Sequence, residues 1–250
     1  MNTSVGAAHC LRVSVIVPVK NERGNLAPLI AEIDAAMAPI GPYEIIYVDD
    51  GSTDETPHML ADLQATRPHL RVITHDVSAG KTTALHSGIT VARASLIATL
   101  DGDGQNDPAF LPAMILALEA APPDVGLVQG ERQRRRDTIF KRVQSRTANF
   151  IRRLVLSDIT VDTGCGLKVI RRDVYLRLPL FHGLHRFIPA LVRREGYAII
   201  VHSVADRPRL SGQSHYGFFD RLWVGLLDMA GVWWLIRRRG PRPNATERRP

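Results

Sequence analysis

The chain has 250 residues, of which 45% are hydrophobic and 23% are charged, and its formal net charge is +7. A chain of this length and composition can bury a large apolar core without disulfide or metal staples, which excludes a small disulfide-rich protein and a disordered chain. The two cysteines, Cys10 and Cys165, are too few for a disulfide framework or a zinc site, so we expect reduced thiols in a cytoplasmic protein.

The first hundred residues predict strands that alternate with helices. The expected strands are residues 11–17, ending at Pro18, then 43–48, 70–74 and 95–100, and the expected helices are residues 25–38, 54–65 and 80–92. The first apolar run is too short for a signal peptide, and we expect no cleaved targeting segment. Strands that alternate with helices predict an α/β fold, with a Rossmann-like, mostly parallel sheet and flanking helices.

A candidate metal site follows the fourth predicted strand. The apolar run at residues 95–100 breaks abruptly into Asp101, Asp103 and Gln105, and a glycine separates each of these residues from the next. The glycines permit a tight turn that would bring the three side chains onto one side. Carboxylate and amide oxygens suit Mg²⁺ or Mn²⁺, so we expect one of these ions here.

The other predicted strands are also followed by polar loops. Because the carboxyl ends of parallel strands meet at one edge of a sheet, the loop acids should gather there. These acids are Glu22, Asp49, Asp50, Asp101 and Asp103. Such an edge suits a nucleotide, since carboxylates accept hydrogen bonds from ribose hydroxyl and base N–H groups while a metal ion binds the diphosphate.

Each loop also has an ordinary structural interpretation, which the sequence leaves open. Glu22 could be a solvated loop acid, and Asp49 and Asp50 could belong to a simple turn. The candidate helix caps are Ser52 or Asp54 for the second helix, and Asn106 or Asp107 for a helix that begins at Pro108.

The segment Ala-Gly-Lys-Thr at residues 79–82 is not the phosphate-binding loop (P-loop) of nucleoside triphosphatases. That loop requires a glycine five residues before Gly80, where this chain has His75. We therefore interpret Gly80 as the start of a helix.

The positive charge lies in two segments. Residues 131–153 contain nine Lys and Arg against two acids, and residues 237–250 contain six Arg against one acid. Phosphates, an anionic membrane face or nucleic acid could be their partner. A nucleic-acid-binding protein would interleave basic and aromatic residues on a sheet face, whereas these segments are predicted to be helical beside acidic loops, so we expect no nucleic acid partner.

Three motifs together resemble the inverting family 2 glycosyltransferases of GT-A fold. They are Val-Ile-Val-Pro-Val-Lys-Asn-Glu at 15–22, Tyr-Val-Asp-Asp-Gly-Ser-Thr-Asp at 47–54 and Asp-Gly-Asp-Gly-Gln-Asn-Asp-Pro at 101–108. Within that family the chain is most similar to the dolichyl-phosphate mannosyltransferase and undecaprenyl-phosphate glycosyltransferase group, over residues 12–236. The resemblance implies that Pro18, Asn21, Glu22, Asp49, Asp50 and Asp101 bind the nucleotide sugar, and that Asp101, Asp103 and Gln105 bind the metal ion and the diphosphate.

The second half of the chain carries the residues expected on the acceptor side. By resemblance, Arg132 after the strand at 125–129 and Arg146 in a following helix clamp a lipid phosphate. Asp162 lies where some relatives are thought to have a base, although an ionised phosphate monoester is already a nucleophile and positioning should suffice.

A glycine-flanked loop and a helix end the predicted structure. Residues 207–217 resemble a mobile lid in which Arg209 contacts the donor diphosphate and His215 replaces a usual lysine. Residues 218–236 predict an amphipathic helix that either packs on the core or lies on an anionic membrane, with Arg237, Arg238 and Arg239 after it. We expect a GT-A domain at 1–210, the lid and interfacial helix at 211–236, and a basic disordered tail at 237–250.

The resemblance implies a metal-dependent enzyme that is cytoplasmic and peripheral on the inner face of the membrane. It would move a hexose of the mannose or glucose type from a nucleotide diphosphate sugar to a polyprenyl phosphate, with Asp103, Asp162 and Arg209 at the reacting groups. The alternative within the family is transfer to a saccharide or lipid hydroxyl, which requires a general base.

Overall fold

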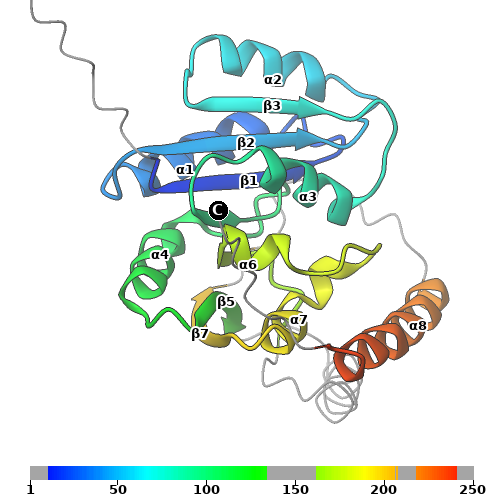
Figure 1. Ribbon diagram of the computed structural model, residues 1–250. Helices are drawn as coiled ribbons and strands as arrows, with labels where there is room; N and C mark the ends of the chain where they lie inside the picture. Colours follow the sequence, from blue (N-terminus) through cyan, green and yellow to red (C-terminus); the bar gives the residue numbers. More distant parts are fainter. Residues whose placement is uncertain (1–10, 134–161, 206, 208–217, 241–250) are drawn as a thin grey trace, which may run out of the picture.

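The computed structural model describes residues 11–133, 162–205, 207 and 218–240, and for residues 133, 218–224 and 226 it describes the backbone alone (Figure 1). These residues form one seven-stranded sheet with the strand order β3-β2-β1-β4-β6-β5-β7. All neighbouring strands are parallel except the two pairs that contain β6, which is antiparallel to β4 and β5. The predicted α/β fold with a mostly parallel sheet is confirmed.

The strands are β1 (Val13–Val19), β2 (Tyr43–Asp49), β3 (Leu70–Thr74), β4 (Leu96–Thr99), β5 (Val125–Gln133), β6 (Lys168–Arg171) and β7 (Ala198–Ala205). The α-helices are α1 (Leu26–Met37), α2 (Thr56–Ala65), α3 (Lys81–Val91), α4 (Leu111–Ala120), α6 (Arg172–Leu176), α7 (Ile188–Arg194) and α8 (Phe218–Arg237). Two 3₁₀ turns, η1 (Pro108–Phe110) and η2 (Leu184–Arg186), complete the described elements.

The elements predicted in the first hundred residues are confirmed, with one correction at the end of β1. The strand does not stop at Pro18 but continues to Val19, and Pro18 pairs with Val48. The ladder between β1 and β4 ends at Thr99, opposite Ile16, so β1 has a neighbour on one side only beyond that point. A strand that is paired on one side can tolerate a residue without a backbone N–H.

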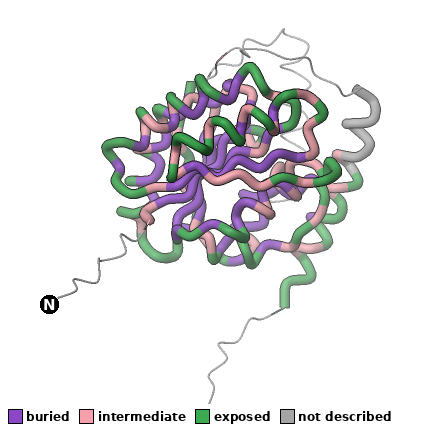
Figure 2. The backbone as a smooth tube through the Cα atoms, turned by 90° about the horizontal axis from the view of Figure 1, so that it is seen from above, coloured by how far each residue is buried: buried purple, intermediate pink, exposed green. Residues whose placement is uncertain are grey.

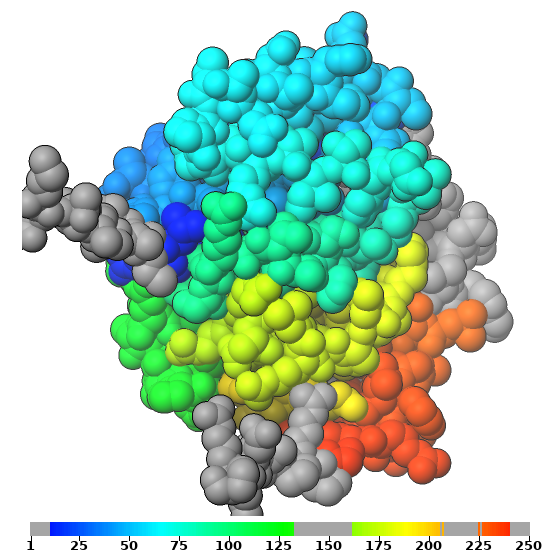
Figure 3. Space-filling view, turned by 45° about the horizontal axis from the view of Figure 1, so that its top comes forward, coloured from blue at the N-terminus to red at the C-terminus, as the bar shows by residue number. Residues whose placement is uncertain are grey.

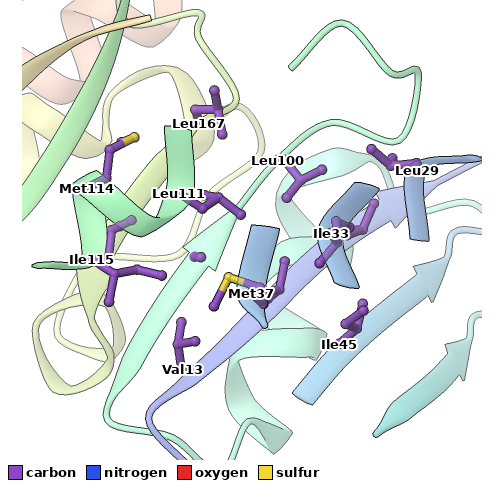
Figure 4. Close-up of a cluster of buried hydrophobic side chains, with 14 of the residues drawn as sticks. Val13, Leu29, Ile33, Met37, Ile45, Leu100, Leu111, Met114, Ile115 and Leu167 are labelled. Atoms are coloured by element: carbon purple, nitrogen blue, oxygen red, sulfur yellow. The ribbon is translucent and has the colours of Figure 1, made fainter. Parts of the chain in front are cut away.

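The apolar core lies on both faces of the sheet. Valines 13, 15, 17 and 19 of β1 point to the face that α1, α2 and α4 cover, and Ile16 points to the face that α3, α6 and α7 cover. This period of two explains why the strands read as almost continuous apolar runs, since helices bury both faces. Figure 2 shows the buried strands between the exposed outer sides of the helices, and Figure 4 shows part of the first face.

The strand order places a crevice between β1 and β4. The chain moves outward from β1 through β2 to β3, and then returns to the other side of β1 to form β4. At such a switch point a ligand site is expected beyond the carboxyl ends of the strands. Glu22 and Asp101, which follow these two strands, line one cavity there.

The helix α8 packs on α7 through one side and leaves the other side exposed (Figure 1). Val232 is fully buried, and Asp228 forms an ion pair with Arg186. Trp233 and Trp234 remain 38% and 54% exposed. In the part of the chain that the structure describes, no helix combines the length and the apolar character that a membrane span requires.

Candidate functional site

A cavity of 330 Å³ lies at the carboxyl edge of the sheet, at the crevice between β1 and β4. Its lining residues come from the end of β1, from the loops after β1, β2, β3 and β4, and from the start of α3. They are Pro18, Val19, Lys20, Glu22, Asp50, Ser78, Gly80, Lys81, Ala84, Asp101, Gly102 and Asp103. Four of the five acids that were expected to gather at this edge, Glu22, Asp50, Asp101 and Asp103, therefore share one cavity.

The fifth acid, Asp49, lies outside this lining and is fully buried. It is the last residue of β2, and the period of a strand places it on the same face as Ile45 and Tyr47, which contact α1 and α2. Its Oδ1 accepts the Ser52 N–H at 3.0 Å. Asp49 therefore shapes the loop after β2 from inside the protein.

Asp50 binds the loop that leads into α3. Its carboxylate accepts hydrogen bonds from the backbone N–H groups of Ala79 and Gly80 at 2.9 and 2.8 Å, and from Ser78 Oγ at 2.8 Å. His75 Nδ1 lies 2.8 Å from Asp50 Oδ1. Burial raises the pKa of Asp50, but these hydrogen bonds outweigh it and lower the pKa below its ordinary value. Asp50 thus fixes the wall of the cavity from which Lys81 projects.

Asn21 connects the loops after β1 and β2 and lies outside the cavity lining. Its backbone has φ of +56°, in the left-handed region that asparagine tolerates better than most residues. Its Oδ1 accepts the Thr53 N–H at 2.8 Å, and its own N–H donates to Ser52 Oγ at 2.9 Å. These bonds orient the neighbouring Glu22, which lines the cavity and accepts a hydrogen bond from Asn25 Nδ2 at 2.6 Å.

The loop after β4 combines a turn with a helix start. Asp107 caps η1 by accepting the Ala109 N–H at 2.9 Å, as one of the two candidate caps was expected to do. Asn106 has a different role, because its Oδ1 accepts the Asp101 N–H at 2.9 Å. These two contacts account for Asn106 and Asp107 and leave Asp101 and Asp103 for the cavity.

Asp101 and Asp103 suit a divalent cation, since carboxylate oxygens are the hard donors that Mg²⁺ and Mn²⁺ prefer and both residues line the same cavity. Gln105 lies outside the lining, and its N–H donates to Asp103 Oδ1 at 3.1 Å. Among the described residues no cluster of three or more His, Cys, Asp and Glu side chains could hold an ion. A cation held here would complete its shell with water and phosphate oxygens, as Mg²⁺ commonly does.

Lys81, which was not expected at the site from the sequence, forms an ion pair with Asp101. Burial raises the pKa of Asp101, but the charge and hydrogen bond of Lys81, and then the charge of Lys168, outweigh it and lower the pKa. The two partners of this pair are 20 residues apart. A sequence signal did exist, because Lys81 follows the glycine that begins α3 at the same sheet edge.

Behind the cavity, a segment of close backbone contacts leads to β6. A Cβ on Gly166 would lie 2.3 Å from Asn106 Oδ1 and 2.5 Å from Asp101 Oδ1, so only glycine allows this approach. Lys168 is buried, and burial together with the charge of Lys81 lowers its pKa to about 8. Lys81, Asp101, Gly166 and Lys168 line a second hollow of 10 Å³.

His185 also lines this second hollow and was not identified from the sequence. Its Nδ1 lies 2.8 Å from Thr82 Oγ1, on the first turn of α3. Burial, followed by the charges of Lys81 and Lys168, lowers the pKa of His185 to about 3. The imidazole is therefore neutral at physiological pH.

Arg132 and Asp162 form a two-point ion pair on the far side of Gly164. Arg132 Nε donates to Asp162 Oδ2 at 2.6 Å, and Nη2 donates to Oδ1 at 3.0 Å. Their side chains are 14% and 12% exposed. Gly164 lies beside this pair and also lines the second hollow with Asp101, so the pair and the second hollow are neighbours.

Three expected site residues, Arg146, Arg209 and His215, lie outside the residues that the structure describes. Arg207, next to the predicted lid, is described and binds two acids. Its guanidinium forms ion pairs with Glu32 at 2.8 Å and with Asp107 at 2.6 Å. In Figure 3, residues 162–205 lie between the first half of the chain and α8.

Comparison with known proteins gives a family match. The family model described as "Glycosyl transferase family 2" matches residues 14–178. The chain is 34% identical over 249 residues to a dodecaprenyl-phosphate galacturonate synthase of Rhizobium johnstonii, covering 94% of this chain and 70% of that protein. It is 32% identical over 209 residues to an undecaprenyl-phosphate 4-deoxy-4-formamido-L-arabinose transferase of Klebsiella pneumoniae, covering 83% of this chain and 63% of that protein.

A similar fold is found among solved structures. A mannosyltransferase from Pyrobaculum calidifontis, in complex with GDP-Man and Mn²⁺, superposes with a TM-score of 0.65 at 18% identity, covering 94% of this chain and 67% of that chain. At this identity the likeness shows the fold alone.

Proposed function

This chain belongs to glycosyl transferase family 2, and we propose that it transfers a sugar from a nucleotide diphosphate sugar to the phosphate of a polyprenyl phosphate. The observation that supports this most is the cavity at the switch point between β1 and β4, where Asp101 and Asp103 share one wall. The names of the relatives support the lipid phosphate as the acceptor.

The cavity residues have distinct roles in this proposal. Pro18, Glu22 and Asp50 form the side that faces the nucleoside, and Asp101 and Asp103 form the side that holds Mg²⁺ or Mn²⁺. A bound divalent cation would neutralise the diphosphate leaving group. Asn21 and Asp49, which were expected to contact the nucleotide directly, act in the proposal through the loops that they support.

The proposed reaction is a direct displacement at the sugar. An oxygen of the acceptor phosphate forms a bond to the anomeric carbon while the bond from that carbon to the donor diphosphate breaks, and the nucleoside diphosphate leaves. The configuration is thereby inverted. A phosphate monoester is ionised at neutral pH, so no side chain has to remove a proton from the nucleophile.

Arg132 is the proposed contact for the acceptor phosphate, and Asp162 orients it. An arginine can bind a carboxylate and a phosphate at the same time because its guanidinium has five N–H donors. A carboxylate that already accepts two charge-assisted hydrogen bonds is a weak candidate for a general base. We therefore assign Asp162 a positioning role.

The sugar itself needs a direct test. A hexose of the mannose or glucose type was expected, whereas the relatives are named for galacturonate, a hexuronate, and for a formamido-arabinose. We propose a hexose or its uronic acid form as the transferred group.

An exposed apolar side of α8, which contains Leu227, Trp233 and Trp234, is the proposed contact with an anionic membrane that holds the acceptor.

The test is a transfer assay with purified protein, Mn²⁺ and undecaprenyl phosphate in vesicles. Radiolabelled UDP-galacturonic acid, UDP-glucose, GDP-mannose and UDP-4-deoxy-4-formamido-L-arabinose are offered separately, and the extracted lipid is counted. We expect one of the first three donors, each of which carries a hexose or a hexuronic acid, to label the lipid. Label that stays in the aqueous phase with every donor would contradict the proposed function.

A further inference from the structure

The cavity carries more acidic than basic side chains. The acids in its lining are Glu22, Asp50, Asp101 and Asp103, and the bases are Lys20 and Lys81. A nucleoside diphosphate is itself an anion, so a cavity of this composition repels it unless cations face the phosphates. A metal ion on Asp101 and Asp103 offsets part of the negative charge, and the protein must supply the rest.

Lys81 is placed where it can contribute that charge. It is the first residue of α3 after Gly80, and Asp50 holds both backbone N–H groups that precede it. The side chain reaches Asp101 across the cavity edge, and the two side chains are 33% and 27% exposed. The ammonium group is therefore anchored by a rigid loop yet open to the cavity.

Lys81 is not the only lysine near Asp101. Lys168 lines the second hollow together with Lys81 and Asp101. Of these two lysines, Lys81 is the one that also lines the larger cavity. A lysine has a flexible stem and a compact charge, so it can turn from Asp101 toward a phosphate oxygen nearby.

We propose that Lys81 binds the diphosphate of the donor and that it stays paired with Asp101 until the donor and the metal ion arrive. This role of Lys81 rests on the proposed function. In the donor complex the ammonium group contacts phosphate oxygens. Before that, Lys81 and a divalent cation compete for the same carboxylate. Lys81 is therefore a binding residue for one anion and a competitor of one cation.

This double role predicts two opposite effects in Lys81→Gln. The affinity for a nucleoside diphosphate should fall roughly 10- to 100-fold, as expected for one lost charge-assisted contact, while the affinity for the matching monophosphate changes little. The affinity for Mn²⁺ without nucleotide should rise, because Asp101 is no longer occupied. If Lys81 only stabilised the loop, its substitution would weaken the binding of the diphosphate and of Mn²⁺ together.

The experiment uses the full chain and two titrations. Calorimetry measures UDP against UMP and GDP against GMP at constant Mn²⁺, and electron paramagnetic resonance measures free Mn²⁺ without nucleotide. Thermal denaturation confirms that each variant is folded. Lys81→Arg should keep the preference for the diphosphate, and Arg93→Gln, which removes a charge at the opposite edge of the sheet, should change neither titration.

The outcomes separate this inference from the proposed function. If the wild-type protein binds neither UDP better than UMP nor GDP better than GMP, the proposed function itself is contradicted. Wild-type protein with such a preference, and Lys81→Gln that keeps it, overturns the role of Lys81 alone. Equal losses for diphosphate and monophosphate, or weaker binding of Mn²⁺ in Lys81→Gln, also overturn it.

Discussion

The guanidinium of Arg132 holds the carboxylate of Asp162 at two points, with Nε 2.6 Å from Oδ2 and Nη2 3.0 Å from Oδ1. The two residues are separated by 30 positions and meet because β5 and the segment before β6 lie side by side. A pair of this geometry fixes the plane of the guanidinium. In the proposed function this fixed plane directs Arg132 toward the acceptor phosphate.

This pair predicts how Asp162→Asn behaves. If Asp162 orients Arg132, the variant should raise the KM for polyprenyl phosphate about tenfold and leave the KM for the nucleotide sugar unchanged, with Arg132→Gln acting in the same direction. The loss of binding free energy for polyprenyl phosphate in the double variant should be smaller than the sum of the losses in the two single variants, because both substitutions disrupt the same ion pair. Steady-state kinetics with each substrate varied in turn provides the measurement. A general base would instead show itself as a loss of kcat in Asp162→Asn with both KM values unchanged.

The metal site predicts a different result for Asp103→Asn. The variant should lose at least about 3 kcal/mol of transition-state stabilisation, roughly a hundredfold in rate, and should bind nucleotide no better with Mn²⁺ than without it. The fold should survive, because Asp103 lies in a loop. Asp76→Asn is the matched control, since Asp76 is an exposed acid after β3 outside the cavity lining. Undiminished turnover of Asp103→Asn would remove Asp103 from the site.

The buried His185 predicts a pH dependence of stability. Its pKa is lowered to about 3, first by burial and then by the charges of Lys81 and Lys168, whereas an unfolded histidine titrates near 6.5. Between these two values the unfolded chain binds a proton that the folded chain does not. The free energy of unfolding should therefore decrease as the pH falls below about 6.5, by at most about 1.4 kcal/mol per pH unit from this group.

Urea denaturation between pH 7 and pH 5 measures this slope, above the range in which the carboxylates titrate. His185→Asn should flatten the slope, while His58→Asn, which changes an exposed histidine on α2, should not. An identical slope in His185→Asn and in the wild type would show that His185 takes up its proton in the folded protein.

The outer side of α8 predicts binding to anionic vesicles. Trp233 and Trp234 are exposed, and the guanidinium groups of Arg237 and Arg238 lie 4.5 and 6.0 Å from the centres of their rings. The protein should float with anionic vesicles, and Arg237→Gln with Arg238→Gln should abolish flotation, since each arginine near such a surface contributes roughly 1 kcal/mol. Arg239 is kept, because its Nη2 donates to Glu195 O at 3.0 Å and holds the helix end on the core.

High salt should release the bound protein, because the attraction is electrostatic. Turnover of a short water-soluble acceptor should be the same in the variant and in the wild type. Flotation that is equal with neutral and anionic vesicles would contradict the role of the arginines. Failure to float at any salt concentration would leave α8 as a helix that packs on the core.

The first half of the fold was predictable because its strands are apolar on both faces and its helices lie between them in a regular order. The second half was harder, since β6 has only four residues, Lys168–Arg171, and pairs antiparallel within a sheet that alternation alone suggests is parallel. Short strands carry too few residues for a period of two to become visible.

The site was predictable as a set of acids but not as a set of contacts. Adjacent acids look alike in a sequence, yet the period of β2 buries Asp49 and turns Asp50 to the cavity. Lys81 and Asp101 meet only because α3 starts at the sheet edge where β4 ends. Contacts between loops depend on the strand order, which the local pattern of residues does not contain.

The most direct test of the central claim compares two acceptors that differ only in the phosphate. Purified protein receives its labelled donor and Mn²⁺ together with either undecaprenyl phosphate or undecaprenol, and mass spectrometry identifies the lipid product. We predict a sugar joined to the lipid through a phosphodiester in the first reaction and no product in the second. A glycosylated undecaprenol, or equal yields from both acceptors, would contradict a phosphate acceptor.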